Sequence, residues 1–166
     1  MMKVHKAWLL LGGNLGDVEN TFKKALDALD AAGLKLVRAS ALYQSEAWGE
    51  GVRGIFYNQA VSVLTVEDPL RLLKLINNIE AKLGRKRTPG VIASRTLDID
   101  ILFFDDKVVS LPELVIPHPR LHMRRFALLP LSEIAPGLRH PLLDKTVKEL
   151  LEETGDTLMV EKLGLS

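Results

Sequence analysis

Thr96-Leu-Asp-Ile-Asp-Ile-Leu-Phe-Phe104 is the stretch of this 166-residue sequence that decides the fold. Its run of apolar side chains is typical of a buried strand. Side chains alternate between the two faces of a strand, so Asp98 and Asp100 share one face while Leu97 and Ile99 point into the core on the other. The stretch therefore predicts a sheet that is apolar on one face and carries an acidic pair on the opposite face.

Further strands and helices are predicted upstream of this stretch. Apolar runs and alternating patterns indicate strands, and the last two of them flank a glycine-rich loop over residues 49–54. Helical spacing of apolar residues indicates two helices, stopped by Gly33 and Gly84, the second of which begins at Pro69. The expected elements are strands over His5–Leu11, Leu34–Trp48 and Phe56–Val66, and helices over Asp17–Ala32 and Pro69–Leu83.

The resulting order β-α-β-β-α-β is that of a ferredoxin-like sheet with its helices on one face. The C-terminal part adds extended pieces near Val108 and Leu114, a helix from about Arg124 to Ile134, and a last helix near Val147–Glu153. No internal repeat or Pro/Ser-rich linker divides the chain. The sequence predicts an α+β fold: one ferredoxin-like α/β sandwich domain over residues 1–166, with a mostly antiparallel sheet and added C-terminal elements.

Composition excludes several classes of protein. Hydrophobic residues make up 47% of the chain, too many for a disordered polar protein. The 22 Lys and Arg residues nearly balance the 21 Asp and Glu residues, so there is no overall attraction for nucleic acid or an anionic membrane. Cysteine is absent, which excludes disulfides and thiolate metal sites. With no apolar run near the roughly 20 residues that span a bilayer, we expect a cytoplasmic protein that binds neither membranes nor nucleic acid.

The acidic pair is interpreted together with the residues before it. Two carboxylates on one strand face repel each other unless water or a cation screens them, and Mg²⁺ prefers such oxygen ligands. The preceding segment, Gly84–Arg95, carries four cations, a proline and two glycines. Cations beside an acidic pair are typical of a polyphosphate held by metal on one side and guanidinium groups on the other. Taken alone, either feature would be better interpreted as solvated surface.

Two other segments give weaker signals. Pro117-His-Pro-Arg-Leu-His-Met-Arg-Arg-Phe126 offers His and Arg donors to phosphate or ribose oxygens, although Arg124 and Arg125 can also simply begin a helix. Gly12-Gly-Asn-Leu-Gly-Asp17 joins a strand to a helix but lacks the lysine and the spacing of a phosphate-binding loop. For this segment we favour a tight turn followed by a helix cap.

With these segments in place, the sequence resembles the 6-hydroxymethyl-7,8-dihydropterin pyrophosphokinase family. The matching segments follow the family's order over about residues 7–140, and Arg-Thr-Leu-Asp-Ile-Asp with Pro-His-Pro-Arg downstream is highly specific. The segments are Leu11–Gly16, Tyr43–Gly49, Phe56–Ala60, Ile79–Arg85, Ser94–Asp100 and Ile116–Arg120.

The resemblance implies an enzyme of folate synthesis that uses ATP, two Mg²⁺ ions and 6-hydroxymethyl-7,8-dihydropterin, and releases AMP. We expect it to be a monomer. It implies that Asp98 and Asp100 bind the metal ions and that Arg85 and Arg95 neutralise charge on the phosphates. The other positions that match the family's ATP contacts are Asn77, Glu80, Arg87, Ile101, His118 and Arg124. The positions that match its pterin slot are Ser45, Trp48, Phe56, Asn58 and Phe126.

Some positions depart from the family pattern. Val91 and Ile92 stand near the place where some members carry a tryptophan, and Pro119 replaces a tyrosine that follows the Pro-His in some relatives. Both departures concern loop closure and the contact with ribose. The stretch after about Leu143 carries no motif that we can interpret.

Two other classes of protein share some of these features. A two-metal nucleotidyl cyclase or polymerase palm also places an acidic pair on a similar sheet, but it releases pyrophosphate and needs no aromatic slot. A non-catalytic ferredoxin-like module could bind RNA or a regulatory ligand. Only 5% of the residues are aromatic, and no RNA-binding strand motif is present. Both alternatives are therefore minor ones.

Overall fold

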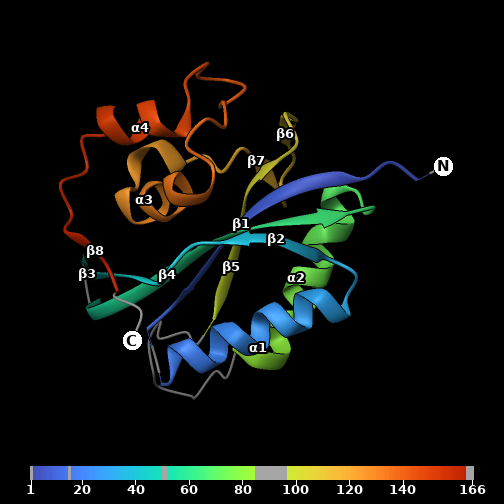
Figure 1. The fold of residues 1–166 in the computed structure, drawn as a ribbon, viewed down its shortest axis with the longest axis horizontal. Coiled ribbons are helices and arrows are strands. Elements are labelled where there is room, and N and C mark those ends of the chain that lie inside the picture. Colours follow the sequence, from blue (N-terminus) through green and yellow to red (C-terminus); the bar gives the residue numbers. More distant parts are fainter. Residues whose placement is uncertain (1, 15, 50–51, 85–96, 164–166) are drawn as a thin grey trace.

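The predicted acidic strand forms one end of the main sheet. A computed structural model describes residues 2–14, 16–49, 52–84 and 97–163, apart from the side chains of residues 47–49, 52 and 53 (Figure 1). The 6-stranded sheet has the order β5-β1-β4-β3-β8, and β2 also pairs with β4. The strands are β1 His5–Gly13, β2 Lys35–Ala39, β3 Tyr43–Gly49, β4 Val52–Thr65, β5 Asp98–Phe104 and β8 Val160–Lys162. Every pair in it is antiparallel, which confirms the predicted type of sheet.

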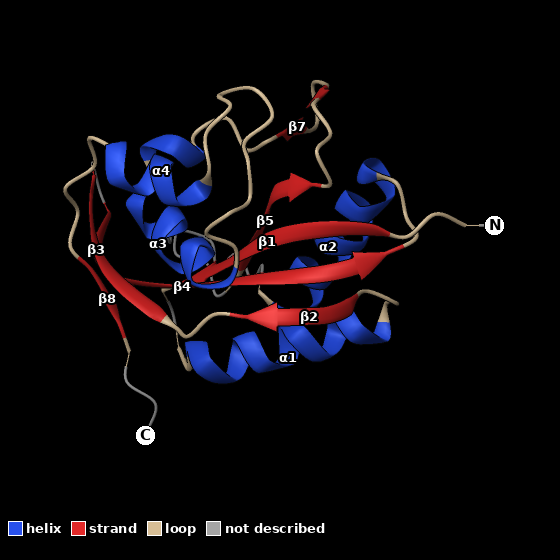
Figure 2. Cartoon of the chain, turned by 45° about the horizontal axis from the view of Figure 1, so that its top comes forward, coloured by secondary structure: helices blue, strands red, loops and turns tan. Residues whose placement is uncertain are grey.

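Helices cover both faces of this sheet (Figures 1 and 2). Within the described residues the helices are α1 Val18–Ala31, α2 Pro69–Leu83, the 3-10 helix η1 Leu121–Met123, α3 Arg125–Ile134 and α4 Val147–Glu153. Helices α1 and α2 lie on one face, as the sequence predicted, whereas α3 and α4 lie on the other. The expectation of helices on one face therefore holds only for the ferredoxin-like part. A small hairpin, β6 Val109–Ser110 with β7 Val115–Ile116, precedes η1.

The sequence of β1 explains why both faces are covered. Ala7, Leu9 and Leu11 belong to the apolar cluster that includes residues of α1 and α2. Trp8 and Leu10 belong to the cluster that includes residues of α3 and α4. A strand that is apolar on both faces is stable only when both faces are removed from water, so the C-terminal helices are part of the core.

Side-chain caps fix where the first two helices begin. The carboxylate of Asp17 accepts a hydrogen bond from the backbone N–H of Asn20 at 3.2 Å, which confirms the cap predicted at the end of the first turn. Asp68 does the same for Arg71 at 2.8 Å, and Pro69 follows it directly. Each cap satisfies a backbone donor that has no partner inside the helix.

One predicted strand is divided in the structure. The stretch predicted as a single strand over Leu34–Trp48 forms β2 and β3, which pair with different parts of β4. Between them Ser40 bonds to Ala60 of β4 twice: its N–H donates to the carbonyl at 2.8 Å, and its hydroxyl accepts the N–H at 2.9 Å. The loop predicted at residues 49–54 is also shorter, because Gly49 already pairs with Val52.

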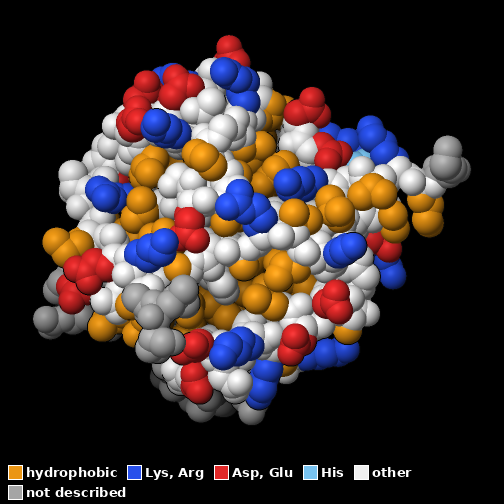
Figure 3. Space-filling view, in the orientation of Figure 1, with side chains coloured by type: hydrophobic (Ala, Val, Ile, Leu, Met, Phe, Trp, Pro, Cys, Tyr) orange, Lys and Arg blue, Asp and Glu red, His pale blue; other side chains and the backbone are white. Residues whose placement is uncertain are grey.

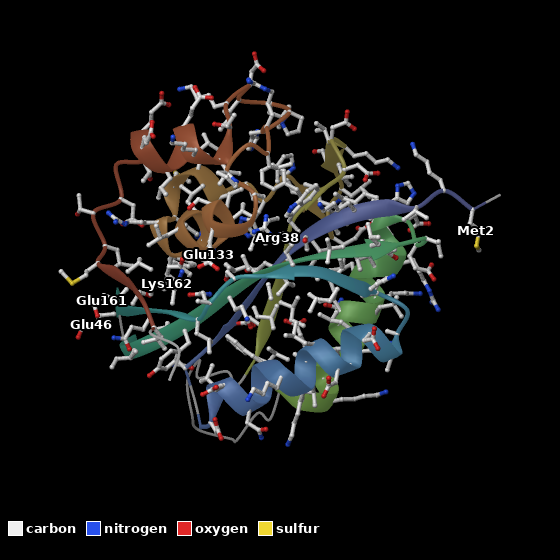
Figure 4. All side chains as sticks on the ribbon, viewed as in Figure 1. Met2, Arg38, Glu46, Glu133, Glu161 and Lys162 are labelled. Atoms are coloured by element: carbon white, nitrogen blue, oxygen red, sulfur yellow. The ribbon has the colours of Figure 1, made fainter. Side chains whose placement is uncertain are left out.

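A half-buried glutamate joins α3 to the sheet. Glu133 of α3 accepts hydrogen bonds from the hydroxyl of Tyr43 at 2.6 Å and from the N–H of Ala41 at 3.0 Å. The ammonium group of Lys162 in β8 lies 3.2 Å from the same carboxylate (Figure 4). Arg38 of β2 adds a hydrogen bond to the carbonyl of Ile134 at 3.1 Å. These contacts fix the position of α3 over the end of the sheet that carries β3 and β8.

The surface agrees with the balanced composition. On the face shown in Figure 3, Lys and Arg side chains alternate with Asp and Glu, and apolar side chains lie between them. None of the helices within the described ranges has the length and apolar character needed to cross a bilayer.

Candidate active site

A cavity of about 440 Å³ lies beside the acidic pair, on the sheet face that carries α3. It brings together both acids and most of the predicted pterin slot. The predicted residues that line it are Ser45, Phe56, Asn58, Asp98, Asp100, Arg124 and Phe126. They come from β3, β4, β5 and the start of α3, so the fold gathers residues that are far apart in the sequence.

The pairing of three strands sets the floor of this cavity. Asp98 of β5 lies opposite Gly12 of β1, and Gly12 lies opposite Asn58 of β4. Directly opposed residues of antiparallel strands project from the same face. The two acids are half-buried, whereas Ile99 between them is 4% exposed and packs in the core with α1 and α2. The alternation predicted for this strand is thus confirmed.

Gly12 leaves room for the amide of Asn58. A Cβ atom at position 12 would lie 2.9 Å from Nδ2 of Asn58, closer than such contacts normally allow. Asn58 is 8% exposed, and its Nδ2 donates to the carbonyl of Leu11 at 3.3 Å. This bond holds the side chain against β1 at the cavity wall and supplies one of the partners that a buried amide needs.

Two aromatic residues enter the cavity from different elements. Phe56 of β4 lies opposite Ser45 of β3 in the strand pair, and Ser45 is 6% exposed. Phe126 belongs to the first turn of α3, and the guanidinium carbon of Arg124 lies 5.4 Å from the centre of its ring. Phe56 and Phe126 are half-buried and line the cavity, and Phe126 also packs against the apolar cluster beneath α3.

His118 lies close enough to the acidic pair to sense its charge. The backbone N–H of His118 donates to the carbonyl of Leu102 at 3.0 Å, and its ring atom Nδ1 accepts a hydrogen bond from the backbone N–H of Arg120 at 3.2 Å. Burial is the largest influence on its pKa, which it lowers from the ordinary value; the carboxylate of Asp100 opposes this, and the nearby guanidinium groups add to it. A neutral imidazole can use Nδ1 as an acceptor, in agreement with the bond from Arg120.

Other predicted residues are not among the described residues that line this cavity. Asn77 is exposed on α2, and Glu80 is 5% exposed and accepts a hydrogen bond from the N–H of Ile99 at 3.0 Å. The side chain of Ile101 packs in the core, so only its backbone is available to a ligand. Arg85, Arg87 and Arg95, with the rest of the basic loop, lie outside the described residues, as does the side chain of Trp48.

Several lining residues were not predicted from the sequence. They are Leu10, Gly12, Gly13, Asn14 and Leu158. The turn after β1 was interpreted as a turn and helix cap alone, yet its residues also form part of the cavity wall. Asn14 carries a buried Oδ1 atom that has no hydrogen-bond partner among the described residues. Leu158 comes from the C-terminal stretch in which no motif was found.

Carboxylates in this cavity are suited to a hard cation. Asp98 and Asp100 supply oxygen ligands from one strand face, and phosphate and water oxygens normally complete the coordination of Mg²⁺. The described residues contain no group of three or more His, Asp or Glu side chains placed to hold a metal ion. Among the described residues, Asp98 and Asp100 are therefore the two side chains that we expect to bind a cation here.

Comparison with known proteins gives close matches over most of the chain. An enzyme named 2-amino-4-hydroxy-6-hydroxymethyldihydropteridine pyrophosphokinase from Aquifex aeolicus is 37% identical over 146 residues, which cover 88% of this chain and 90% of that protein. A protein of the same name from a Synechocystis species is 36% identical, over 92% of this chain and 78% of its own length.

Among solved structures, the wild-type HPPK-DHPS protein of Plasmodium falciparum superimposes with a TM-score of 0.71 at 21% identity. The match covers 91% of this chain but 44% of that longer protein, so the chain spans less than half of it. This likeness confirms the fold, with its mostly antiparallel sheet. The profile of the family described as 7,8-dihydro-6-hydroxymethylpterin-pyrophosphokinase matches residues 8–136, and with the relatives above it shows that the chain belongs to this family.

Proposed function

We propose that this protein transfers the pyrophosphate group of ATP to the hydroxymethyl group of 6-hydroxymethyl-7,8-dihydropterin and releases AMP, as a step of folate synthesis. The observation that carries the proposal is one cavity in which an acidic pair lies beside the amide of Asn58 and the rings of Phe56 and Phe126. Aromatic faces and an amide that both donates and accepts suit a flat heterocycle. Family membership supports the same activity.

The two substrates would use different walls of the cavity. The pterin ring would lie between Phe56 and Phe126, with its polar edge on Asn58 and Ser45; Trp48 is assigned to the same slot by resemblance. ATP would be held by Arg124 and His118 from the C-terminal half and by Asn77, Glu80, Arg87 and the backbone of Ile101. Support for the ATP contacts outside the cavity comes from the resemblance alone.

We propose that Asp98 and Asp100 hold two Mg²⁺ ions. Both carboxylates are half-buried on one strand face inside the cavity, the donor set that Mg²⁺ prefers. Bound ions would supply positive charge to the phosphate oxygens and fix their orientation.

The transfer makes and breaks one bond at the β-phosphorus. The hydroxymethyl oxygen attacks this phosphorus in line, and the bond to the oxygen that bridges to the α-phosphorus breaks. AMP departs with the bridging oxygen and its electron pair, while the proton of the hydroxyl group passes to water. Arg85 and Arg95 would neutralise charge on the transferred group. The slot contributes by holding the attacking oxygen in place, which lowers the entropic cost of the reaction.

The nucleotide product tests this proposal. The protein is incubated with Mg²⁺, γ-³²P-labelled ATP and 6-hydroxymethyl-7,8-dihydropterin, with a matched reaction that lacks the pterin. We expect label on the pterin together with an equal amount of AMP, and neither product without the acceptor. ADP with a singly phosphorylated pterin would show transfer of the γ-phosphoryl group instead. Free pyrophosphate with a cyclic nucleotide would favour the cyclase alternative.

We also propose that the protein acts as a monomer in the cytoplasm. The absence of cysteine agrees with a reducing compartment.

A further inference from the structure

The segment Thr154–Met159, here called the strap, connects α4 to β8. Leu158 of the strap lines the cavity described above. It also lines two neighbouring hollows, one of about 280 Å³ beside β3 and β8, the other of about 550 Å³ beside η1 and α4. This one apolar side chain is thus a shared wall of all three spaces.

Contacts on both sides of Leu158 hold it in place. On one side, the carboxylate of Asp156 accepts hydrogen bonds from the N–H of Arg125 at 2.8 Å and from the N–H of Leu158 itself at 3.0 Å. On the other side, Val160 pairs with Ser45 across β8 and β3. Arg125 directly precedes Phe126 in α3, so the strap is fixed to both sides of the predicted pterin slot.

The described residues that follow Leu158 in the chain do not line the cavity. Met159 is 72% exposed and lines the hollow beside β3 and β8 but not the cavity with the acidic pair. Val160 is 8% exposed and belongs to the sheet. Leu158, half-buried between them, is the strap residue that lines the cavity together with Phe56 and Phe126.

We propose that Leu158 determines which pterins fit, by closing the side of the slot and limiting the size of substituents on the ring. The inference rests on the proposed function of the same site. The physical basis is steric. A polar side chain such as Asn58 selects the hydrogen-bonding groups on the edge of the pterin ring, whereas an apolar side chain at the wall excludes larger substituents and shields the ring from water. Asp156 acts as a positioning residue, because it holds the strap without lining the cavity.

Opposed substitutions test the proposal. Leu158→Ala removes apolar surface from the cavity wall, so we expect binding of 6-hydroxymethyl-7,8-dihydropterin to weaken about tenfold. Binding of an analogue enlarged by an ethyl group at C7 or N8 should weaken far less or improve, so that the preference for the parent compound falls. Leu158→Phe should have the opposite effect on this preference. The adjacent exposed residue supplies the matched control, Met159→Ala, which should change neither affinity.

Affinities are measured by calorimetric titration in the presence of Mg²⁺ and a non-hydrolysable ATP analogue, and thermal unfolding shows that each variant is folded. Asp156→Asn should weaken parent-pterin binding while leaving affinity for the ATP analogue unchanged. If Leu158→Ala and Leu158→Phe bind both pterins as the wild type does, Leu158 is not the selecting wall. If the wild type itself neither binds nor converts the pterin, the proposed function fails, which is a different result.

Discussion

Asp98 and Asp100 are the side chains on which the proposed chemistry depends most. Replacing either by asparagine keeps its size but removes the charge that would bind Mg²⁺, so we expect turnover to fall by about a hundredfold or more. Stability should be unchanged or slightly higher, since two like charges on one strand face repel each other. Single-turnover product formation and thermal unfolding measure the two effects. The control is Asp106→Asn, an exposed acid that does not line the cavity.

Near-normal turnover of both variants at saturating Mg²⁺ would contradict the metal assignment. A large loss of stability in either one would instead show that these acids are structural.

Asn58 offers a second test, because the position of its amide depends on the space left by Gly12. Asn58→Ala removes a buried hydrogen-bond partner and should weaken pterin binding about five- to a hundredfold, with affinity for the ATP analogue nearly unchanged. Gly12→Ala should resemble it, since a Cβ atom there would lie 2.9 Å from Nδ2 and push the amide aside. Calorimetry with each ligand separates the two affinities. An equal loss for both ligands would place the pterin elsewhere.

The link between α3 and β3 depends on Glu133. In Glu133→Gln one carboxylate oxygen is lost as an acceptor for Tyr43 or Ala41, and we expect the free energy of unfolding to fall by about 1–2 kcal/mol. Urea unfolding of Glu133→Gln, Tyr43→Phe and the double variant measures the coupling of the pair. Additive effects would show that the hydrogen bond contributes nothing beyond the separate side chains.

The same link should make stability depend on pH. Burial alone would raise the pKa of Glu133, but hydrogen bonds from Tyr43 and Ala41 and the charge of Lys162 hold it below its ordinary value of 4.5. A carboxyl group whose pKa is lower in the folded state stabilises the protein fully above its unfolded-state pKa. The advantage of the wild type over Glu133→Gln should therefore be constant above about pH 5 and shrink as the pH falls below 4.5.

Local patterns predicted the elements well where one apolar stripe or alternation decides them. The acidic strand, both helices of the ferredoxin-like part and the cap at Asp17 were found from the sequence. The break between β2 and β3 was not, because it depends on Ser40 bonding to Ala60 of a strand 20 residues away. Leu158 was not predicted for a similar reason: an apolar residue in an irregular segment shows no sequence pattern, and its role depends on the residues that lie beside it in the fold.

Ligand binding should stabilise the whole domain and report on the metal. At about 100 times the dissociation constant, a ligand that binds only the folded state adds about 2.7 kcal/mol, which raises Tm by about 5–11 °C for a protein of this size. We expect Mg²⁺ with a non-hydrolysable ATP analogue to produce such a shift. Removing the metal with EDTA should abolish most of it, and an unchanged shift would mean that the nucleotide binds without metal.

The arrangement of layers was the least predictable property of the molecule. Hydropathy shows that residues of α3 and α4 are buried, but it does not say against which face of the sheet they pack. The apolar run of β1, with Trp8 and Leu10 as well as Leu9 and Leu11, was the available sign that both faces are covered. The site depends on this choice, because Phe126 and Arg124 reach the acidic pair only from the face that carries α3.

The pairing of β8 with β3 also has a consequence for protein synthesis. Gln44 and the glutamate that faces it, Glu161, are 117 positions apart in the chain. At about 5–20 residues per second a ribosome needs roughly 6–23 s to reach the second from the first. During that interval the outer edge of β3 lacks the strand that covers it in the finished protein, and an uncovered edge readily pairs with other chains. Translation that pauses late in this message should therefore prolong the exposure of β3 to wrong partners.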